Sequence, residues 1–136
     1  MYAAEIDPLK YLDKVPKYFL FGDTNVKNIE IPNNITSISF GAFYNCSSLT
    51  SVIIPDSVTS IGWYVFSGCS DLTSVIVPDS VIYIGFQAFY GCISLTSITY
   101  KSTIEDWKKI DKGEHWNDKV PKTCIIHCVD GDISAR

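Results

Sequence analysis

The amino-acid sequence predicts a β-rich solenoid with short helical or 3-10 turns, built from about four 23-residue repeats and closed by a helix and a strand. Three observations predict it. Cysteines recur at one constant spacing, at Cys46, Cys69 and Cys92. Phenylalanine, leucine and proline recur at the same spacing. After Tyr100 the periodicity stops, and the pattern becomes that of a helix and then a strand.

The repeated positions divide the chain into a repeat region, 1–100, and a C-terminal capping segment, 101–136. The columns that share the cysteine spacing are Phe43, Phe66 and Phe89; Leu49, Leu72 and Leu95; Val52, Val75 and Ile98; and Pro32, Pro55 and Pro78. They predict repeats at 32–54, 55–77 and 78–100. The apolar frame extends back to a degenerate repeat, 9–31, in which Asp23 and Leu9 stand in the cysteine and proline columns. Terminal repeats of a solenoid are often atypical.

The sequence pattern of each repeat predicts two short extended segments and a turn. In the middle of the array, residues 49–55 are β-branched and end in a proline that cannot continue a ladder. Residues 57–62 predict a second extended segment, with Val58 and Ile61 pointing inward. Residues 63–70 have room for no more than one helical or 3-10 turn. One such unit buries too little apolar surface to fold alone, so neighbouring repeats must share their apolar faces.

The capping segment begins with a short amphipathic helix. Residues 102–110 carry a Ser-Thr start, early acids, late lysines and apolar residues at 104, 107 and 110. Residues 123–129 predict a strand, and Asp130-Gly131 is a turn signal. We expect these elements to cover the open edge of the last repeat.

Composition excludes several classes of partner. The chain has 46% hydrophobic residues, a net charge of −4 and a pI near 5.0, without a basic run. Nucleic acid and anionic membrane surfaces are therefore not expected as partners. No segment has the length and apolar character of a membrane span, and the opening segment lacks the pattern of a signal peptide. An N-terminal segment without a signal peptide fits either a cytosolic protein or a fragment of a longer exported protein, and we favour the fragment.

No combination of residues predicts catalysis, a metal or a cofactor. The columnar cysteines sit close enough for a ladder of disulfides or metal ligands, but an odd total of five cysteines and the flanking Phe and Leu columns favour free, buried thiols. Cys124 and Cys128 share one strand face while His127 points to the other, which disfavours zinc. His115 lies in a polar loop, and no serine, histidine and acid pattern suggests a triad. We therefore expect a protein that is not an enzyme.

The informative surface is the outward side of the first strand of each repeat. It presents three columns, which are Thr50, Thr73 and Thr96; Ser51, Ser74 and Ser97; and Ile53, Ile76 and Thr99. One interpretation is that threonine and serine suit an exposed sheet. The other is a shallow docking face for a protein or glycan, and these nine residues are the candidate site.

A second candidate surface is aromatic. Phe40, Trp63 and Phe86 form one column, with four tyrosines nearby, at 44, 64, 83 and 90. Aromatic side chains with polar tips are favoured at interfaces and sugar sites. Because the three column members directly follow the second strand, we favour packing between neighbouring turns over ligand binding.

The repeat unit L-T-S-V-I-I-P-D-S-V-T-S-I-G-x-x-x-F-x-x-C resembles the BspA-type leucine-rich repeat of surface proteins from anaerobic bacteria and some protists. The likeness is strongest over 32–100 and weaker over 9–31. Trp107, Trp116-Asn117 and the closing Ile-His-Cys segment resemble the end of such arrays. The resemblance implies a leucine-rich-repeat solenoid in an extracellular or cell-surface protein that adheres to host or neighbouring cells, without catalytic residues. The alternative is a structural spacer or end-cap of a larger surface protein.

Overall fold

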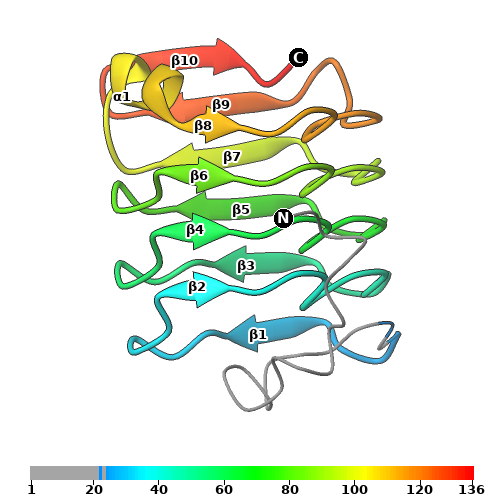
Figure 1. Ribbon diagram of the computed structural model, residues 1–136. Coiled ribbons are helices and arrows are strands. Elements are labelled where there is room, and N and C mark those ends of the chain that lie inside the picture. Colours follow the sequence, from blue (N-terminus) through cyan, green and yellow to red (C-terminus); the bar gives the residue numbers. More distant parts are fainter. Residues whose placement is uncertain (1–21, 23) are drawn as a thin grey trace.

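The computed structural model describes residue 22 and residues 24–136, and these form a solenoid of stacked turns (Figure 1). One side is a six-stranded sheet whose strands lie in the order β1 (Asn28–Glu30), β3 (Ser51–Ile53), β5 (Ser74–Val77), β7 (Ser97–Tyr100), β9 (Ile125–Cys128) and β10 (Gly131–Ser134). The other side is a four-stranded sheet of β2 (Ser37–Ile38), β4 (Ser60–Ile61), β6 (Tyr83–Ile84) and β8 (Asp111–Lys112). The predicted solenoid class is confirmed.

The strands pair in the register that the repeat predicts. Ser51 pairs with Ser74, and Ser74 pairs with Ser97, in parallel ladders along the six-stranded sheet. Both extended segments form, but the paired strands are shorter than predicted: β3 covers the middle of residues 49–55, and β4 covers two residues near the end of residues 57–62. Most of the degenerate repeat 9–31 lies outside the described residues; the structure describes residues 22 and 24–31 of it, which include β1.

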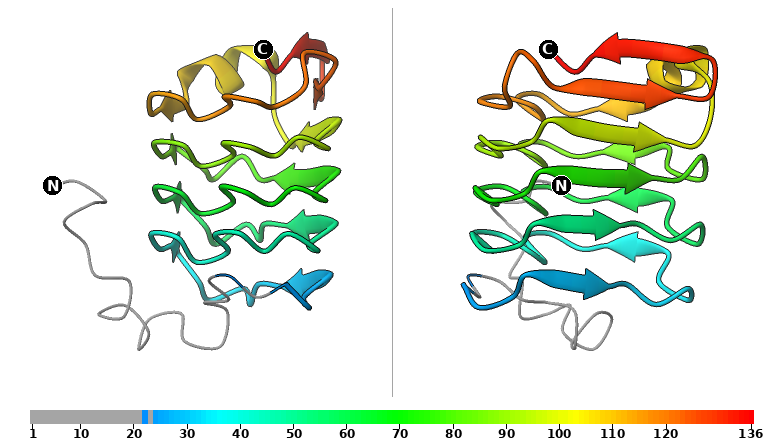
Figure 2. Two further views of the ribbon diagram at one scale, coloured as in Figure 1. Left: turned by 90° about the vertical axis from the view of Figure 1, so that its right-hand side faces the viewer. Right: turned by 180° about the vertical axis from the view of Figure 1, so that it is seen from behind.

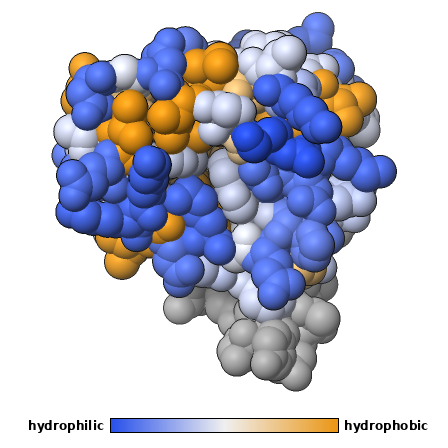
Figure 3. Space-filling view, turned by 90° about the horizontal axis from the view of Figure 1, so that it is seen from above, coloured by the Kyte–Doolittle hydropathy of each residue, from blue (hydrophilic) through white to orange (hydrophobic). Residues whose placement is uncertain are grey.

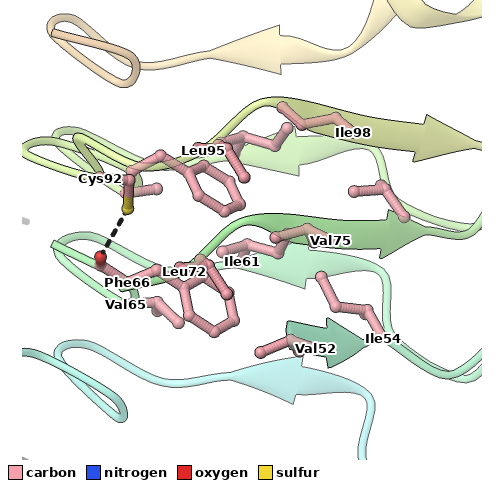
Figure 4. Close-up of a cluster of buried hydrophobic side chains, with 14 of the residues drawn as sticks. Val52, Ile54, Ile61, Val65, Phe66, Leu72, Val75, Cys92, Leu95 and Ile98 are labelled. Carbon is pink, nitrogen blue, oxygen red and sulfur yellow. Dashed lines mark hydrogen bonds between the residues drawn. The ribbon is translucent and has the colours of Figure 1, made fainter. Parts of the chain in front are cut away.

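The core lies between the two sheets and consists of the inward columns (Figure 4). Phe43, Phe66 and Phe89 are buried and stack on one another, with ring centroids 5.4 and 5.2 Å apart. The leucine and valine columns are also buried, and so are Val58 and Ile61 on the second segment. Each turn therefore buries its apolar side chains against the turns before and after it, which is why the repeat folds only in a stack.

A glycine column controls how closely the turns approach after the second strand. A Cβ atom at Gly62, Gly85 or Gly113 would lie 2.9, 2.7 or 2.5 Å from a backbone atom of the preceding turn. Real Cβ atoms do not approach backbone so closely, so these positions accept no side chain without a shift of the stack.

The segment that follows each second strand is a series of turns rather than a helix. In residues 63–70 the bonds Ser67 N–H to Tyr64 C=O and Cys69 N–H to Phe66 C=O span three residues, as in a 3-10 helix. The N–H groups of Tyr64, Phe66 and Gly68 bond to the next turn instead; for example, Phe66 N–H donates to Ala88 C=O over 2.8 Å. Hydrogen bonding between turns thus replaces the continuous helical turn that the sequence allows.

The capping segment folds over the last repeat as predicted and adds two elements that were not. The helix α1 (Ile104–Lys109) begins after Thr103, whose hydroxyl accepts from Asp106 N–H. Trp107 is buried against Tyr100 and Trp116, at centroid distances of 5.2 and 5.9 Å. Strand β9 continues the six-stranded sheet beside β7. The unpredicted elements are β8, which extends the four-stranded sheet, and β10, which pairs antiparallel with β9.

Charged and polar groups hold this cap in place. The Lys112 ammonium donates to the carbonyl oxygens of Trp107 and Ile110, at 2.7 and 3.0 Å. The Asn117 side chain donates to Ala135 C=O, and the Arg136 guanidinium donates to Val120 C=O. In Figure 2 the helix and the last two strands lie at one end of the stack, and in Figure 3 this end is largely hydrophilic with smaller apolar patches.

Candidate functional site

The nine residues of the predicted docking face lie together on the outer side of the six-stranded sheet. Strands β3, β5 and β7 are neighbours, and their register brings each serine beside the next serine and Ile53 beside Ile76 and Thr99. The three threonines directly precede these strands and are exposed. The structure thus assembles the predicted columns into one surface, which we call the sheet face.

The threonine hydroxyls of the sheet face are already engaged. Thr50, Thr73 and Thr96 each donate to a main-chain carbonyl of the preceding turn, at 3.1, 3.1 and 3.3 Å. Ser51 donates to the Asn28 side chain over 3.3 Å. The threonine column therefore reinforces the stacking of the turns, and it is left with hydroxyl lone pairs to offer a ligand.

The apolar part of the sheet face is a short stripe. Ile53, the last residue of β3, is 59% exposed, and Ile76 beside it on β5 is half-buried. The Ile53 side of the stripe borders a hollow of about 330 Å³ that Glu30, Asp56 and Lys101 also line. Lys101 and Asp56 form an exposed ion pair with 3.8 Å between nitrogen and oxygen.

The sequence did not reveal how the sheet face continues on β9 and β10. Thr99 pairs with His127, and His127 pairs with Asp132, so both extend the Ile53 column. The His127 Nδ1 and Asp132 Oδ1 atoms are 3.0 Å apart. The step along the chain from Thr99 to His127 is longer than the repeat period, so the period alone does not place His127 in this column.

A second surface lies on the side of the stack formed by the turns that follow β2, β4, β6 and β8, the side that faces the reader in the left view of Figure 2. We call it the aromatic strip, and it consists of Phe40, Tyr44, Trp63, Tyr64, Tyr83, Phe86, Gln87, Tyr90 and His115. All but the exposed His115 are half-buried. The rings of Phe40, Tyr64, Phe86 and His115 form a chain of edge-to-face contacts with centroids 5.5, 5.5 and 5.9 Å apart.

The expected packing between neighbouring turns is thus present, and the rings also remain accessible. Trp63 packs on Phe86 at 5.4 Å and donates its indole N–H to the Tyr83 hydroxyl over 2.8 Å. Edge-to-face packing fixes each ring while leaving part of it facing outward, so the aromatic strip is a rigid surface.

Two backbone positions are left-handed in each of the turns that follow β2, β4, β6 and β8, and the first of the two belongs to the column that contains Tyr64 and Gln87. Gly41, Tyr64, Gln87 and His115 have φ angles of 64°, 61°, 53° and 58°. Glycine adopts this conformation freely, whereas a residue with a Cβ loses about 1–2 kcal/mol. Gly41 shows that the turn itself needs no side chain here, so Tyr64, Gln87 and His115 occupy positions that are unfavourable for them.

The columnar cysteines belong to the core rather than to a reactive site. All five cysteines are free, and Cys46, Cys69, Cys92 and Cys124 are buried. The Cys69 and Cys92 thiols each donate to a phenylalanine carbonyl of the preceding turn, at 3.1 Å. Figure 4 shows the bond from Cys92 to Phe66. Burial raises the pKa of Cys92 to about 12 and that of Cys69 well above its ordinary value. These thiols are therefore protonated and poorly nucleophilic.

The residues weighed for a metal lie apart. Cys124 is in the core, His127 is exposed beside Asp132, and Cys128 is half-buried. Within residues 22 and 24–136, no three His, Cys, Asp or Glu side chains gather as metal ligands would. His115 lies 2.6 Å from the Asp118 carboxylate at the end of the aromatic strip. In the same part of the chain, no helix has the length and apolar character needed to cross a membrane.

Stacked parallel turns, a capped end and two accessible flat faces define a repeat scaffold of the leucine-rich-repeat type. The family model of the BspA type leucine rich repeat region matches residues 13–111, in six copies. The chain belongs to this family. Its resemblance to the family, inferred above from the repeat unit, is confirmed.

Two solved structures are similar to the chain. A leucine rich cell surface protein from Faecalibacterium prausnitzii A2-165 shares 32% identity with a TM-score of 0.65, over 66% of this chain and 24% of that protein. A leucine-rich repeat protein from Bacteroides ovatus ATCC 8483 shares 32% identity with a TM-score of 0.55, over 79% and 23%. The chain therefore spans about a quarter of each. No curated protein matches it.

Proposed function

We propose that the chain is a non-catalytic recognition module of a bacterial cell-surface or secreted protein. In this proposal the sheet face docks a protein or glycan of a host or neighbouring cell and so contributes to adhesion. The similar Faecalibacterium structure is described as a cell surface protein, which supports this location.

The observation that carries the proposal is the exposed Ile53, which lies beside Ile76 and among hydroxyl groups. Docking surfaces combine an apolar centre with polar groups at its rim. Hydrogen bonds between turns hold the sheet face rigid, so little conformational entropy is lost when a partner binds. A shallow face of this kind suits a macromolecule better than a small substrate, which needs a deep cleft.

A second candidate function is a structural end-piece of a larger surface protein. It is favoured by the three threonine hydroxyls of the sheet face, which already donate hydrogen bonds to the preceding turn. It is also favoured by the cap, whose α1, β9 and β10 close one end of the stack. An end-piece needs no ligand of its own.

A recognition module binds a partner, whereas an end-piece does not. Immobilised fibronectin, fibrinogen and mucin therefore serve as probes. The test variant carries Ser74→Glu and Ile76→Lys on the sheet face. The matched control carries Thr36→Lys and Ser37→Glu, at positions in and beside β2 on the opposite sheet. We expect binding to at least one probe that the test variant loses and the control keeps, with unchanged thermal unfolding. Absence of binding by a folded wild-type chain would support the end-piece.

A further inference from the structure

We propose that the aromatic strip is a separate site that binds a neutral glycan chain laid along the stack. This inference does not rest on the sheet face, which lies on the six-stranded sheet rather than on the turns after β2, β4 and β6. It follows from the hydrogen-bonding groups of the strip, from its backbone, from its charge and from its spacing.

The polar groups of the strip are of a kind that matches sugar hydroxyls. Trp63 spends its indole N–H on the Tyr83 hydroxyl. The polar groups that remain for a ligand include the Tyr64 and Tyr90 hydroxyls and the Gln87 amide, on side chains that are half-buried. These groups both donate and accept hydrogen bonds, as sugar hydroxyls do. The aromatic rings between them offer apolar surface for the C–H faces of pyranose rings.

Gln87 is the residue that packing explains least. Its backbone is left-handed at φ 53°, in the column where Gly41 shows that glycine suffices. Its side-chain amide makes no hydrogen bond to any of the residues that the structure describes, whereas the Tyr64 ring in the same column contacts Phe40 and Phe86. An unfavourable backbone conformation at a residue whose side-chain amide is unpaired, within an aromatic surface, points to a ligand contact.

The charge of the strip favours a neutral ligand. Its members between Phe40 and Tyr90 include no acidic or basic residue. The end of the strip toward the cap carries acidic groups. Asp111 of β8 lies beside Tyr83 in the strand pairing, and His115 lies between the carboxylates of Glu114 and Asp118. Lys119, whose ammonium lies 5.9 Å from the Tyr90 ring centroid, offsets one of these carboxylates. The remaining negative charge would repel a sulfated or sialylated chain.

The spacing of the strip favours a polymer of rings over a peptide. Its aromatic contacts repeat once per turn, at centroid steps of 5.5, 5.5 and 5.9 Å. A linear glycan presents similar rings at regular intervals, so one sugar can contact each turn. Aromatic grooves for proline-rich peptides offer donors to backbone carbonyls, and here the indole donor is already engaged.

The experiment is an NMR titration of the whole chain with maltoheptaose, cellohexaose and chitohexaose, each to about 10 mM, which is ten times a millimolar Kd. The readout is the indole N–H signal of Trp63, with the buried Trp107 as internal reference. We expect at least one neutral oligosaccharide to shift the Trp63 signal and to leave Trp107 unchanged. A heparin hexasaccharide and a proline-rich dodecapeptide are the competing ligand classes, and we expect no shift from either.

Two variants and one control make the test specific to the strip. Gln87→Gly and Tyr64→Gly restore the residue found at Gly41, so relief of backbone strain favours folding while the contacts are lost. We expect each to weaken glycan binding about fivefold, and Val129→Lys, at an exposed position in the turn between β9 and β10, to leave it unchanged. The proposal is overturned if no neutral oligosaccharide shifts Trp63, if only heparin or the peptide does, or if both strip variants bind as well as wild type. None of these outcomes decides whether the sheet face binds a partner.

Discussion

At the scale of single residues, two serines one repeat apart differ in a way that stability measurements can detect. The Ser80 hydroxyl donates to Val58 C=O over 2.7 Å, while the Ser57 hydroxyl oxygen is buried without a partner among the described residues. A satisfied buried hydroxyl stabilises a protein by about 1 kcal/mol, whereas an unsatisfied one costs free energy. We expect Ser80→Ala to lower the free energy of unfolding by about 1 kcal/mol.

The equivalent change Ser57→Ala serves as the matched comparison. The Ser57 hydroxyl is shielded from water and has no hydrogen-bond partner among the described residues. We therefore expect its removal to leave the free energy of unfolding unchanged or to raise it. Urea denaturation of both variants measures the difference. Equal losses in the two variants would show that Ser57 has a hydrogen bond in solution.

The glycine column makes a second prediction at this scale. A Cβ at Gly85 would lie 2.7 Å from the backbone of Gly62 and Trp63. We expect Gly85→Ala to lower the free energy of unfolding by at least about 2 kcal/mol, because neither turn can move without disturbing the stack. The control is Gly91→Asn, since Asn45 already adopts the left-handed conformation in that column. Thermal and urea unfolding compare them, and similar losses would contradict the steric explanation.

The sequence revealed the buried columns but not the left-handed ones. Val52, Val75 and Ile98 share hydrophobicity, and a regular repeat period makes that shared property visible. Gly41, Tyr64, Gln87 and His115 share only a backbone angle. No common side-chain property marks them, so the geometry of the aromatic strip had to come from the structure.

At the scale of elements, helix α1 predicts a specific response to acid. The Ser102 hydroxyl bonds the Asp106 carboxylate, and with the Lys109 ammonium 3.8 Å away it holds the pKa of Asp106 below its usual range. This contribution to stability is complete above the unfolded pKa of about 3.9 and is lost as the pH falls through the lower folded value. We expect thermal unfolding to show that loss below about pH 4.

The Asp106→Asn variant tests this assignment, because it removes the titrating group and keeps a similar shape. We expect the variant to have a lower melting temperature at neutral pH and a weaker dependence on pH in the acid range. Glu105→Gln, on the same helical turn, is the control. If it flattens the acid response as much as the Asp106 variant does, the effect belongs to the net charge of the helix.

The predicted helix and the last predicted strand formed because their sequences carry clear signals, whereas β8 and β10 do not. Thr103 and the spacing of Ile104, Trp107 and Ile110 marked the helix. Strand β8 has two residues, and the Gly-Asp-Ile-Ser of β10 has a single apolar side chain. Both form because paired strands are already present beside them, so tertiary context decides their structure.

At the scale of the whole molecule, the capping segment breaks the repeat without breaking the sheet. Strand β9 pairs with β7 at an offset longer than the repeat period, and α1 with the following loop takes up the difference. A search at a fixed period cannot place residues beyond such an insertion. For this reason the predicted sheet face ended at Thr99, while the structure extends its outer column to His127 and Asp132.

In the part of the chain that the structure describes, the cap lies at the C-terminal end of the stack, so the turns are expected to open unevenly, and the cysteines can report this. Cys46, Cys69, Cys92 and Cys124 are buried in successive turns, and the last lies within the cap. Burial raises the pKa of Cys92 to about 12 and of Cys124 to about 11, so alkylation at neutral pH requires local opening. Since each turn is stabilised only by its neighbours, turns far from the cap should open more often.

We therefore expect pulse alkylation of the native chain to label the half-buried Cys128 first, then Cys46, and Cys92 and Cys124 last. Peptide mapping by mass spectrometry gives the rate at each site. The variant Trp107→Ala, which removes the buried ring that packs on Tyr100 and Trp116, should speed labelling of Cys92 and Cys124 more than that of Cys46. Equal rates at the four buried thiols would instead show that all the turns unfold together, as one cooperative unit despite their linear arrangement.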